Sequence, residues 1–380
     1  MRFATSFVSS IAILAGSAAA HPGHDISQEV KERRDFLGSV KRTNLGHCAA
    51  QLKARGVEKR NVERRAALLE KARAKRGLNK RDLSSVLATS HNATDLGYTT
   101  STDAATLFAG YNSCLLTPEV TQGPYYVGGE YVRQNIIEEQ AGVDTILDYQ
   151  VIDINTCEPV TDVYVEMWHC NATGVYSGIV AGGNGDSSDE TNINNTWLRG
   201  IQKTDSDGVA QFESIFPGHY TSRATHIHIM VHQNAVLLQN ETLGNNVSAS
   251  HVGQAFFDQD LITAVELTAP YSTNSQELTL NADDGILSEE TATDGIDPFF
   301  EYTLLGDSIT DGIFAWVAFG INATASQSIT PAAFYYKEGG VANANSGAGG
   351  PGGSGGPGGA PPSGVPSGIP SSTTAPATSL

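Results

Sequence analysis

The most regular hydrophobic pattern in the chain lies near its middle, between positions 225 and 232. One set of alternate residues is Thr225, Ile227, Ile229 and Val231, and the other is His226, His228, Met230 and His232. Because successive side chains of a strand point to opposite faces, this alternation predicts a strand with one apolar face and one face that carries histidines.

Short runs of strand type recur between positions 115 and 337, separated by Gly, Asp, Asn and Pro. The predicted strands include 145–154, 163–169, 209–212, 226–231, 278–280 and 313–318. They do not alternate with helices as a βαβ fold would require. The pattern therefore predicts an all-β fold class, with a β-sandwich core over residues 115–337.

The regions on either side of this core have other patterns. Apolar residues at three- and four-residue spacing, such as Val62, Ala66 and Leu69, predict helix within residues 26–77. Residues 82–114 are polar and rich in turn formers, and we interpret them as a linker. The Gly-, Pro- and Ser-rich segment 338–380 has almost no bulky apolar residue, so we expect a disordered tail.

The first twenty residues have the pattern of a secretory signal peptide. Arg2 precedes an apolar run over 7–15, and the small residues at 17–20 suit cleavage before His21. This run is too short to span a bilayer, and no later run is long enough. We therefore expect a secreted, extracellular protein with no membrane partner.

Charge is distributed very unevenly. Residues 21–81 hold 17 basic and 7 acidic residues, whereas residues 82–380 hold 5 basic and 34 acidic ones. The strongly acidic remainder argues against nucleic acid as a partner. Two interpretations of the basic segment 21–81 stay open: it pairs with the acidic remainder, or it is removed as a propeptide at one of its dibasic pairs.

Cysteines and glycosylation motifs agree with secretion. The four cysteines permit two disulfides in three connectivities, of which we favour Cys48–Cys114 with Cys157–Cys170. The six Asn-X-Ser/Thr motifs predict a glycoprotein; they begin at Asn92, Asn171, Asn194, Asn240, Asn246 and Asn322. No zinc-type Cys/His spacing is present.

The histidines of the central strand have partners that suggest a metal. His226 and His228 would lie about 7 Å apart on one face, close enough to bind one ion. Tyr220 follows a Pro-Gly turn just upstream, and Tyr176 follows a Gly turn after an apolar strand. Two phenolates and two imidazoles suit Fe(III), because this hard ion favours anionic oxygen ligands.

Several further motifs follow one another in a fixed order. They are Leu-Thr-Pro-Glu at 116–119, Gly-Pro-Tyr-Tyr at 123–126, Arg133 with Asn-Ile at 135–136, Trp-His at 168–169, Leu-Arg-Gly at 198–200, Thr-Asp at 204–205, Pro-Gly-His-Tyr at 217–220 and His-Ile-His at 226–228. In this order they resemble the intradiol ring-cleavage dioxygenases, which include the catechol 1,2- and protocatechuate 3,4-dioxygenases. The resemblance covers about residues 115–257 and is closest to the secreted fungal branch.

The resemblance implies a role for each residue of the site. Tyr176 and His228 match the ligands that remain in the equatorial plane of the iron. Tyr220 and His226 match the axial pair, from which the substrate displaces the tyrosine. Arg223 matches the arginine that stabilises negative charge on the bound ring. Gln254 resembles the active-site glutamine of the family, although it lies further beyond the histidines than is typical.

The implied activity is cleavage of a small phenolic diol by O₂, between its two hydroxylated carbons, to a muconate-type diacid. The acidic remainder favours uncharged catechols or hydroxyquinols, unless Arg223 or the basic segment compensates. In the family, N-terminal helices often form a homodimer contact, which residues 26–77 could provide. We interpret His169, His219 and His232 as structural or supporting residues.

Two alternatives from other classes stay open. A secreted protein of the same fold could bind iron or catechol without turnover. An oxygen-independent enzyme could use another metal at the histidine strand, and it would then not need either tyrosine.

Overall fold

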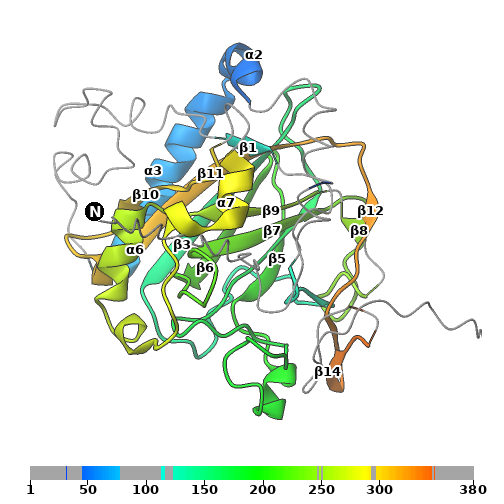
Figure 1. Cartoon of the computed structure of the whole chain (residues 1–380). Helices are drawn as coiled ribbons and strands as arrows, with labels where there is room; N and C mark the ends of the chain where they lie inside the picture. Colours follow the sequence, from blue (N-terminus) through cyan, green and yellow to red (C-terminus); the bar gives the residue numbers. More distant parts are fainter. Residues whose placement is uncertain are drawn as a thin grey trace, which may run out of the picture.

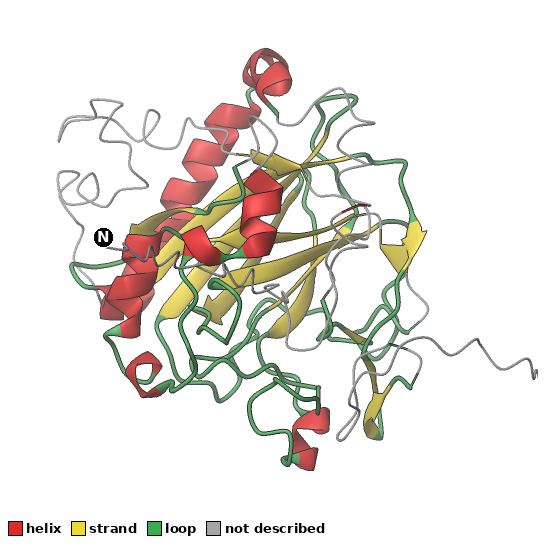
Figure 2. Cartoon of the chain, in the orientation of Figure 1, coloured by secondary structure: helices red, strands yellow, loops and turns green. Residues whose placement is uncertain are grey.

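The structure is a computed structural model that describes residues 31, 45–77, 113–115, 123–245, 248–249, 251–291, 297–344 and 346. The predicted signal peptide, most of the predicted linker and residues 347–380 lie outside the described residues. Strands form the centre of the molecule and the few helices lie at its periphery (Figure 2). The predicted all-β fold class is confirmed.

Two sheets form the sandwich (Figure 1). The strands of the first sheet are β1 (Ser113–Leu115), β3 (Asp144–Asp153), β6 (Val209–Ile215), β10 (Glu301–Leu304) and β11 (Ile313–Ile321). Strand β11 is central, because it pairs in parallel with β1 and β3 and antiparallel with β10. The second sheet is antiparallel, in the order β5 (Arg199–Lys203), β4 (Tyr164–Trp168), β7 (His226–His232) and β9 (His251–Phe256).

Smaller elements surround these sheets. The short strands are β2 (Val127–Gly128), β8 (Ser248–Ala249), β12 (Gln327–Ser328), β13 (Ala333–Tyr336) and β14 (Gly339–Ala342). The α-helices are α2 (Ala49–Ala54), α3 (Val57–Lys75), α6 (Gln259–Glu266) and α7 (Gly285–Thr291). The 3₁₀ turns are η1 (Gly46–Cys48), η3 (Glu190–Asn194), η4 (Tyr271–Thr273), η5 (Asn281–Asp283) and η6 (Ile309–Asp311). None of the described helices has the length and apolar character needed to cross a membrane.

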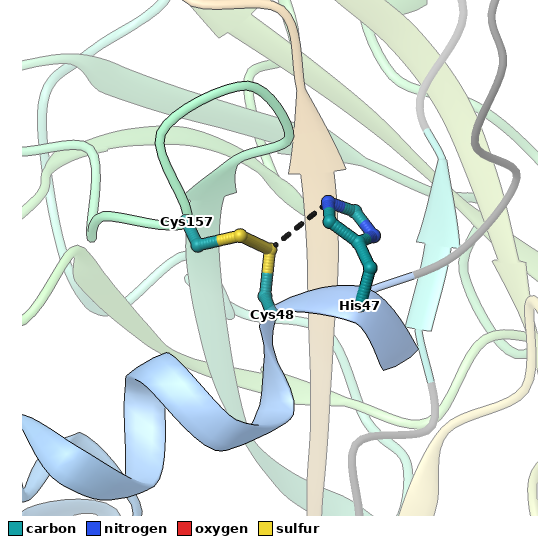
Figure 3. A group of neighbouring side chains, drawn as sticks. All are labelled: His47, Cys48 and Cys157. Atoms are coloured by element: carbon teal, nitrogen blue, oxygen red, sulfur yellow. Dashed lines mark hydrogen bonds between the residues drawn. A yellow bond between two sulfur atoms is a disulfide. The ribbon is translucent and has the colours of Figure 1, made fainter.

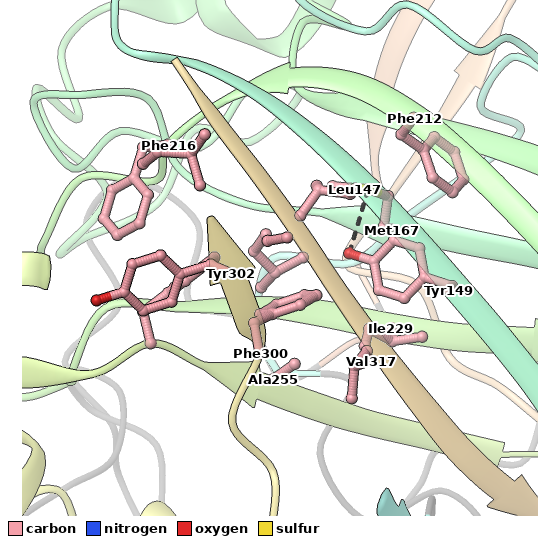
Figure 4. Packing of buried hydrophobic residues seen from close by; sticks show 14 of the residues in the cluster. Leu147, Tyr149, Met167, Phe212, Phe216, Ile229, Ala255, Phe300, Tyr302 and Val317 are labelled. Carbon is pink, nitrogen blue, oxygen red and sulfur yellow. Dashed lines mark hydrogen bonds between the residues drawn. The ribbon is translucent and has the colours of Figure 1, made fainter. Parts of the chain in front are cut away.

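The main core lies between the two sheets (Figure 4). Leu147 and Tyr149 of β3 meet Ile229 of β7 there, with Val317 of β11, and all four are buried. Each large apolar side chain that is fully buried stabilises the fold by roughly 1.5–3 kcal/mol. A slip of one residue in β7 would turn its isoleucines out of this core, so burial fixes the face on which its histidines stand.

The sandwich has two outer faces, and both carry buried polar residues. On the first sheet, Asp148 and Gln150 of β3 lie beneath α3, and we call this surface the helix-covered face. On the second sheet, His226 and His228 of β7 lie beneath loops, and we call this surface the loop-covered face.

Charge pairing attaches the basic segment to the helix-covered face. Arg65 donates from Nε to Asp148 Oδ1 at 3.0 Å, and Arg64 lies 3.1 Å from the same oxygen. The side-chain amides of Asn61 and Gln150 hydrogen-bond each other in both directions, at 2.6 and 3.0 Å. These contacts support the first of the two interpretations, in which the basic segment pairs with the acidic remainder.

The favoured disulfide connectivity was wrong. Cys48 is bonded to Cys157 (Figure 3), and Cys170 is a buried free thiol. Docking of the α2–α3 segment on the first sheet brings Cys48 to the end of β3, a proximity that spacing along the chain cannot reveal. His47 lies 3.2 Å from the Cys48 sulfur, but this group is not a metal site because both thiols are consumed by the disulfide.

Two predicted boundaries also differ from the structure. Residues 278–280 form no strand, because they lead into the 3₁₀ turn η5 and only Leu278 packs against the core. The folded region extends beyond residue 337, because β14 pairs with β13 inside the segment predicted as a tail. The other five predicted strands correspond to β3, β4, β6, β7 and β11, with ends shifted by a few residues.

Candidate metal centre

Three neighbouring strands place side chains in one row on the loop-covered face. His228 of β7 is paired with Trp168 of β4 on one side and with Gln254 of β9 on the other. The Trp168 ring stacks on the His228 ring with centroids 4.9 Å apart and planes within 1°. Sheet register, rather than distance along the chain, therefore brings Gln254 beside the histidines.

The two histidines face each other with their Nε2 atoms. His226 Nδ1 lies 2.6 Å from the carbonyl oxygen of Ala224 and must donate to it, which leaves the Nε2 lone pair exposed to a partner. The two Nε2 atoms are 3.1 Å apart. Imidazole nitrogens bind transition metals at about 2.1 Å, so two of them at right angles around one ion lie about 3 Å apart. The observed separation fits a shared cation.

Two crossing loops carry the tyrosines. The loop that leads to Tyr176 passes so close to the loop that leads to Tyr220 that a Cβ at Gly174 would lie 2.1 Å from the His219 carbonyl oxygen. A Cβ at Gly218 would likewise lie 2.4 Å from the Asn171 carbonyl oxygen. Glycine at both positions permits this crossing, which fixes the two phenol rings relative to each other.

Both phenols point at the histidines and are buried. The Tyr176 and Tyr220 rings meet edge-on with centroids 5.5 Å apart. The Tyr220 hydroxyl lies 3.4 Å from His226 Nε2, and the Tyr176 ring lies 6.0 Å from the His228 ring. Burial is the main cause that raises the pKa of each phenol above its ordinary value of 10. A phenolate here therefore needs a bound cation to stabilise it.

Two asparagines hold the Tyr176 backbone in place. Asn184 accepts a hydrogen bond from the Tyr176 amide at 2.7 Å and donates to the Tyr176 carbonyl oxygen at 2.8 Å. Asn192 donates to the same carbonyl oxygen at 2.8 Å. The sequence analysis did not identify these residues, and the Gly-Gly-Asn-Gly run at 182–185 was the signal that marked a tight loop.

Arg223 completes the cluster and is fully buried. Its Nη2 donates a short hydrogen bond to Oε1 of Gln254, and its Nε donates to Asp284 Oδ2 at 2.8 Å. Burial alone would lower the pKa of Arg223, but Asp284 outweighs it and raises that pKa above its ordinary value. The guanidinium therefore stays charged.

Several polar atoms of this cluster are buried and have no hydrogen-bond partner in the described part of the chain. Among them are the Tyr176 hydroxyl, Arg223 Nη1 and Gln254 Nε2. Leaving such atoms unsatisfied costs about 1–3 kcal/mol each. Bound ligands can satisfy these atoms. A metal ion can bind the phenol oxygen, and a ligand oxygen can accept from the two N–H donors.

The three histidines interpreted above as structural or supporting residues make contacts within the described part of the chain. His169 Nε2 lies 2.7 Å from the Ser214 hydroxyl, His219 Nδ1 lies 2.8 Å from Glu266, and His232 Nε2 lies 2.5 Å from Glu166. His232 shares the face of His226 and His228, but it bonds a carboxylate and Ser248 rather than joining the cluster.

A hollow of about 510 Å³ lies beside the tyrosine loops. Its lining residues are all uncharged; they are Thr173, Gly183, Gly185, Thr221, Thr273, Asn274, Ser275 and Gln276. Thr221 directly follows Tyr220, and Gln276 joins the two loops by donating to the Thr173 carbonyl oxygen at 2.9 Å. The hollow therefore adjoins the cluster through the backbone that presents the tyrosines.

The fold is an all-β sandwich in which two buried tyrosines and two buried histidines converge on one face of the second sheet. Residues 121–269 match the family model described as Dioxygenase (Dioxygenase_C). Catechol 1,2-dioxygenase 1 of Acinetobacter lwoffii is 26% identical over 140 residues, which are 30% of this chain and 42% of that protein. The chain thus spans less than half the length of this curated relative.

Solved structures give similar matches. An intradiol ring-cleavage dioxygenase from Tetranychus urticae is 29% identical, with a TM-score of 0.45 over 57% of this chain and 98% of that one. Catechol 1,2-dioxygenase from Pseudomonas arvilla C-1 is 17% identical, with a TM-score of 0.33 over 79% of this chain and 93% of that one. In the sequence matches, residues 121–269 of this chain are similar to the dioxygenases, among them a catechol 1,2-dioxygenase.

Proposed function

We propose that this protein is a secreted non-haem iron(III) dioxygenase that cleaves catechol-type diols between their two hydroxylated carbons. The observation that carries the proposal is the convergence of Tyr176, Tyr220, His226 and His228 beside two unsatisfied N–H donors. Iron(III) fits this set, because two oxygen ligands that become anionic and two neutral imidazoles balance a hard trivalent ion.

When bound, iron(III) would supply a chelation point for both diol oxygens and draw charge so that the ring reacts with O₂. Tyr176, Tyr220, His226 and His228 would hold it. Tyr220 would also accept one proton of the diol at its phenol oxygen. The Tyr220 hydroxyl is suited to this role. It lies 3.4 Å from His226 Nε2, and burial raises its pKa, so the phenol holds a proton firmly.

Arg223 and Gln254 would act on the ring. Arg223 Nη1 and Gln254 Nε2 both lack partners within the described residues, so both are available to donate to negative charge that develops on the substrate. Trp168 would fix the orientation of His228 by stacking on it. Burial of the whole cluster excludes water and strengthens each of these interactions.

The direct test is oxygen consumption by iron-loaded protein with catechol, together with ultraviolet detection of the muconate product. Consumption of one O₂ per catechol with muconate formation supports the proposal, and Tyr149→Phe, a buried phenol in the main core, is the matched control. Catechol binding in calorimetry without O₂ uptake would instead favour the binding protein. Metal binding that is unchanged in both Tyr176→Phe and Tyr220→Phe, with no O₂ uptake by wild type, would favour the oxygen-independent enzyme.

Secretion remains part of the proposal. A disulfide between Cys48 and Cys157 is typical of an oxidising compartment. Of the glycosylation motifs, Asn194 and Asn240 are exposed, whereas Asn171 donates its amide to Gln140 at 3.1 Å. Amino-terminal sequencing of the mature protein should begin at His21, and mass spectrometry should find glycans at Asn194 and Asn240 before Asn171.

The homodimer through the N-terminal helices also remains a prediction. One face of α3 already packs on its own sheet through Arg65, Leu69 and Arg73. A dimer contact would therefore use the opposite face of that helix, and light scattering of the purified protein measures whether it forms.

A further inference from the structure

We propose that Asp284 is a positioning residue that aims Arg223 at the substrate and cancels its charge, so that the site prefers uncharged diols to diols that carry a carboxylate. The proposal deepens the proposed function and rests on it. It concerns a residue 61 positions away from Arg223 in the chain, at the start of α7.

Asp284 is placed by the fold rather than by the arginine alone. It is 1% exposed, and its Oδ1 accepts the Leu287 amide at 2.8 Å, so it caps the first turn of α7. Its Oδ2 accepts both the Ala224 amide at 2.7 Å and Arg223 Nε at 2.8 Å. The carboxylate is therefore held at three points and cannot follow the arginine if the arginine moves.

The partners of Arg223 leave one direction open. Asp284 takes Nε and Gln254 takes Nη2, which fixes the plane and the rotation of the guanidinium. Nη1 then remains as the buried nitrogen without a partner in the described part of the chain. Because Gln254 stands across from His228, the guanidinium that it holds lies beside the histidines.

The same contact removes a positive charge that an anionic substrate would need. The guanidinium and the buried carboxylate, 2.8 Å apart, form a pair with no net charge, so this pair attracts a second carboxylate less strongly than an unpaired guanidinium would. The basic helix α3 docks on the opposite outer face, where it meets Asp148.

The hollow beside the tyrosine loops also offers no positive charge to an anionic substrate, because none of its lining residues is charged. Hydroxyl and amide groups such as those of Thr221 and Gln276 can hydrogen-bond a neutral or hydroxylated ring, but they cannot neutralise a carboxylate. Uncharged catechols and hydroxyquinols fit these surroundings, and 3,4-dihydroxybenzoate does not.

The test compares Asp284→Asn with Asp283→Asn in full-length, iron-loaded protein. Both changes remove one negative charge at neighbouring positions, but Asp283 is exposed. We expect Asp284→Asn to lower kcat/KM for catechol by about 10- to 100-fold. We also expect the ratio of kcat/KM for catechol to that for 3,4-dihydroxybenzoate to fall at least about 10-fold, because Arg223 regains a net charge. Asp283→Asn should change neither value.

A binding measurement separates this proposal from the proposed function. Calorimetry with phenol and with 4-hydroxybenzoate needs no turnover, and Asp284→Asn should bind 4-hydroxybenzoate more tightly relative to phenol than wild type does. Absence of turnover in wild type would refute the dioxygenase, while this shift would still support the role of Asp284. An unchanged ratio in both assays, or equal effects of the two variants, would overturn the proposal.

Asp284→Glu covers the case in which the asparagine variant does not fold. It keeps the charge but moves the carboxylate by one methylene, so turnover of catechol should fall while the preference for the uncharged diol persists. A loss of that preference in Asp284→Glu would contradict the charge argument.

Discussion

The two outer faces of the sandwich both bury charged and polar side chains, yet they differ in how completely these are satisfied. On the helix-covered face, Asp148 accepts from Arg64, Arg65 and Gln211, and the amides of Asn61 and Gln150 pair fully. On the loop-covered face, the Tyr176 hydroxyl, Arg223 Nη1 and Gln254 Nε2 have no partner among the described residues.

This difference indicates that the helix-covered face has a structural role and that the loop-covered face has a functional one. A buried polar network whose members satisfy one another stabilises one docking geometry and has nothing left to offer a ligand. A network with several unsatisfied atoms that point at one place is destabilising by itself, and it persists where a ligand completes it. The first face explains how the basic segment attaches, and the second is where we place the chemistry.

The largest expected effect concerns the loop-covered face. His228→Ala removes one of the two facing Nε2 atoms, so we expect loss of iron from the purified protein and a fall in kcat of at least about 1000-fold. Metal analysis and oxygen uptake measure the two effects. His47→Ala, which alters a histidine beside the disulfide, is the control and should retain both iron and activity. Full iron content in His228→Ala would contradict the assigned ligand set.

The next effect concerns the helix-covered face. Although burial alone would raise it, Arg65 and Arg64 hold the pKa of Asp148 below its ordinary value. Asp148→Ala leaves Arg65 buried without its partner, which should cost about 3–5 kcal/mol in the free energy of unfolding. Chemical denaturation measures this cost. Glu63→Gln on the exposed side of α3 should change little, and the activity per folded molecule should stay the same in both variants.

A third effect tests an unsatisfied carboxylate beside the loop-covered face. Glu130 is buried, neither of its oxygens has a hydrogen-bond partner in the described chain, and burial raises its pKa to about 8. The folded state therefore holds a proton that the unfolded state has already lost, so wild-type stability should fall as pH rises from 4.5 through 8.

Glu130→Gln removes this titration. We expect it to gain on the order of 4 kcal/mol relative to wild type between pH 5 and pH 9, as measured by denaturation at each pH. Glu139→Gln alters an exposed carboxylate and should follow the wild-type curve. Parallel curves for Glu130→Gln and wild type would show that Glu130 is ionised in the folded protein.

The smallest effect concerns the exposed pairs of α3. Arg60 with Asp207, Lys75 with Glu213 and Arg76 with Asp144 lie at 2.8, 3.1 and 3.0 Å, all partly in solvent. Salt should screen them, so raising NaCl from about 0.05 to 0.5 M should lower the unfolding free energy by no more than roughly 1 kcal/mol. A much larger loss would mean that these pairs, rather than Asp148 and its partners, attach the helix.

Sequence patterns predicted most of the strands of the sandwich. They also placed His226 and His228 on one strand, and Tyr176 and Tyr220 in turns outside that strand. The alternation at 225–232 was informative because burial of Ile227 and Ile229 leaves only one face for the histidines. Local pattern did not fix Gln254, because a long loop separates β7 from β9 and only sheet register places it across from His228.

Contacts between distant segments were beyond the reach of the sequence. Asp284 was not identified, although an aspartate just before a helix is a common capping signal. Its contact with Arg223 depends on how α7 packs against the second sheet. The disulfide was assigned wrongly for the same reason, because the partner of Cys48 is decided by the docking of the segment that carries it.

The most direct test of the metal centre is the visible absorption spectrum of iron-loaded protein before and after anaerobic addition of catechol, for wild type and Tyr176→Phe. We predict a red tyrosinate-to-iron(III) charge-transfer band in wild type that moves to longer wavelength with catechol and weakens in Tyr176→Phe. A protein that retains iron(III) but is colourless would contradict tyrosinate ligation, and with it the proposed chemistry of the loop-covered face.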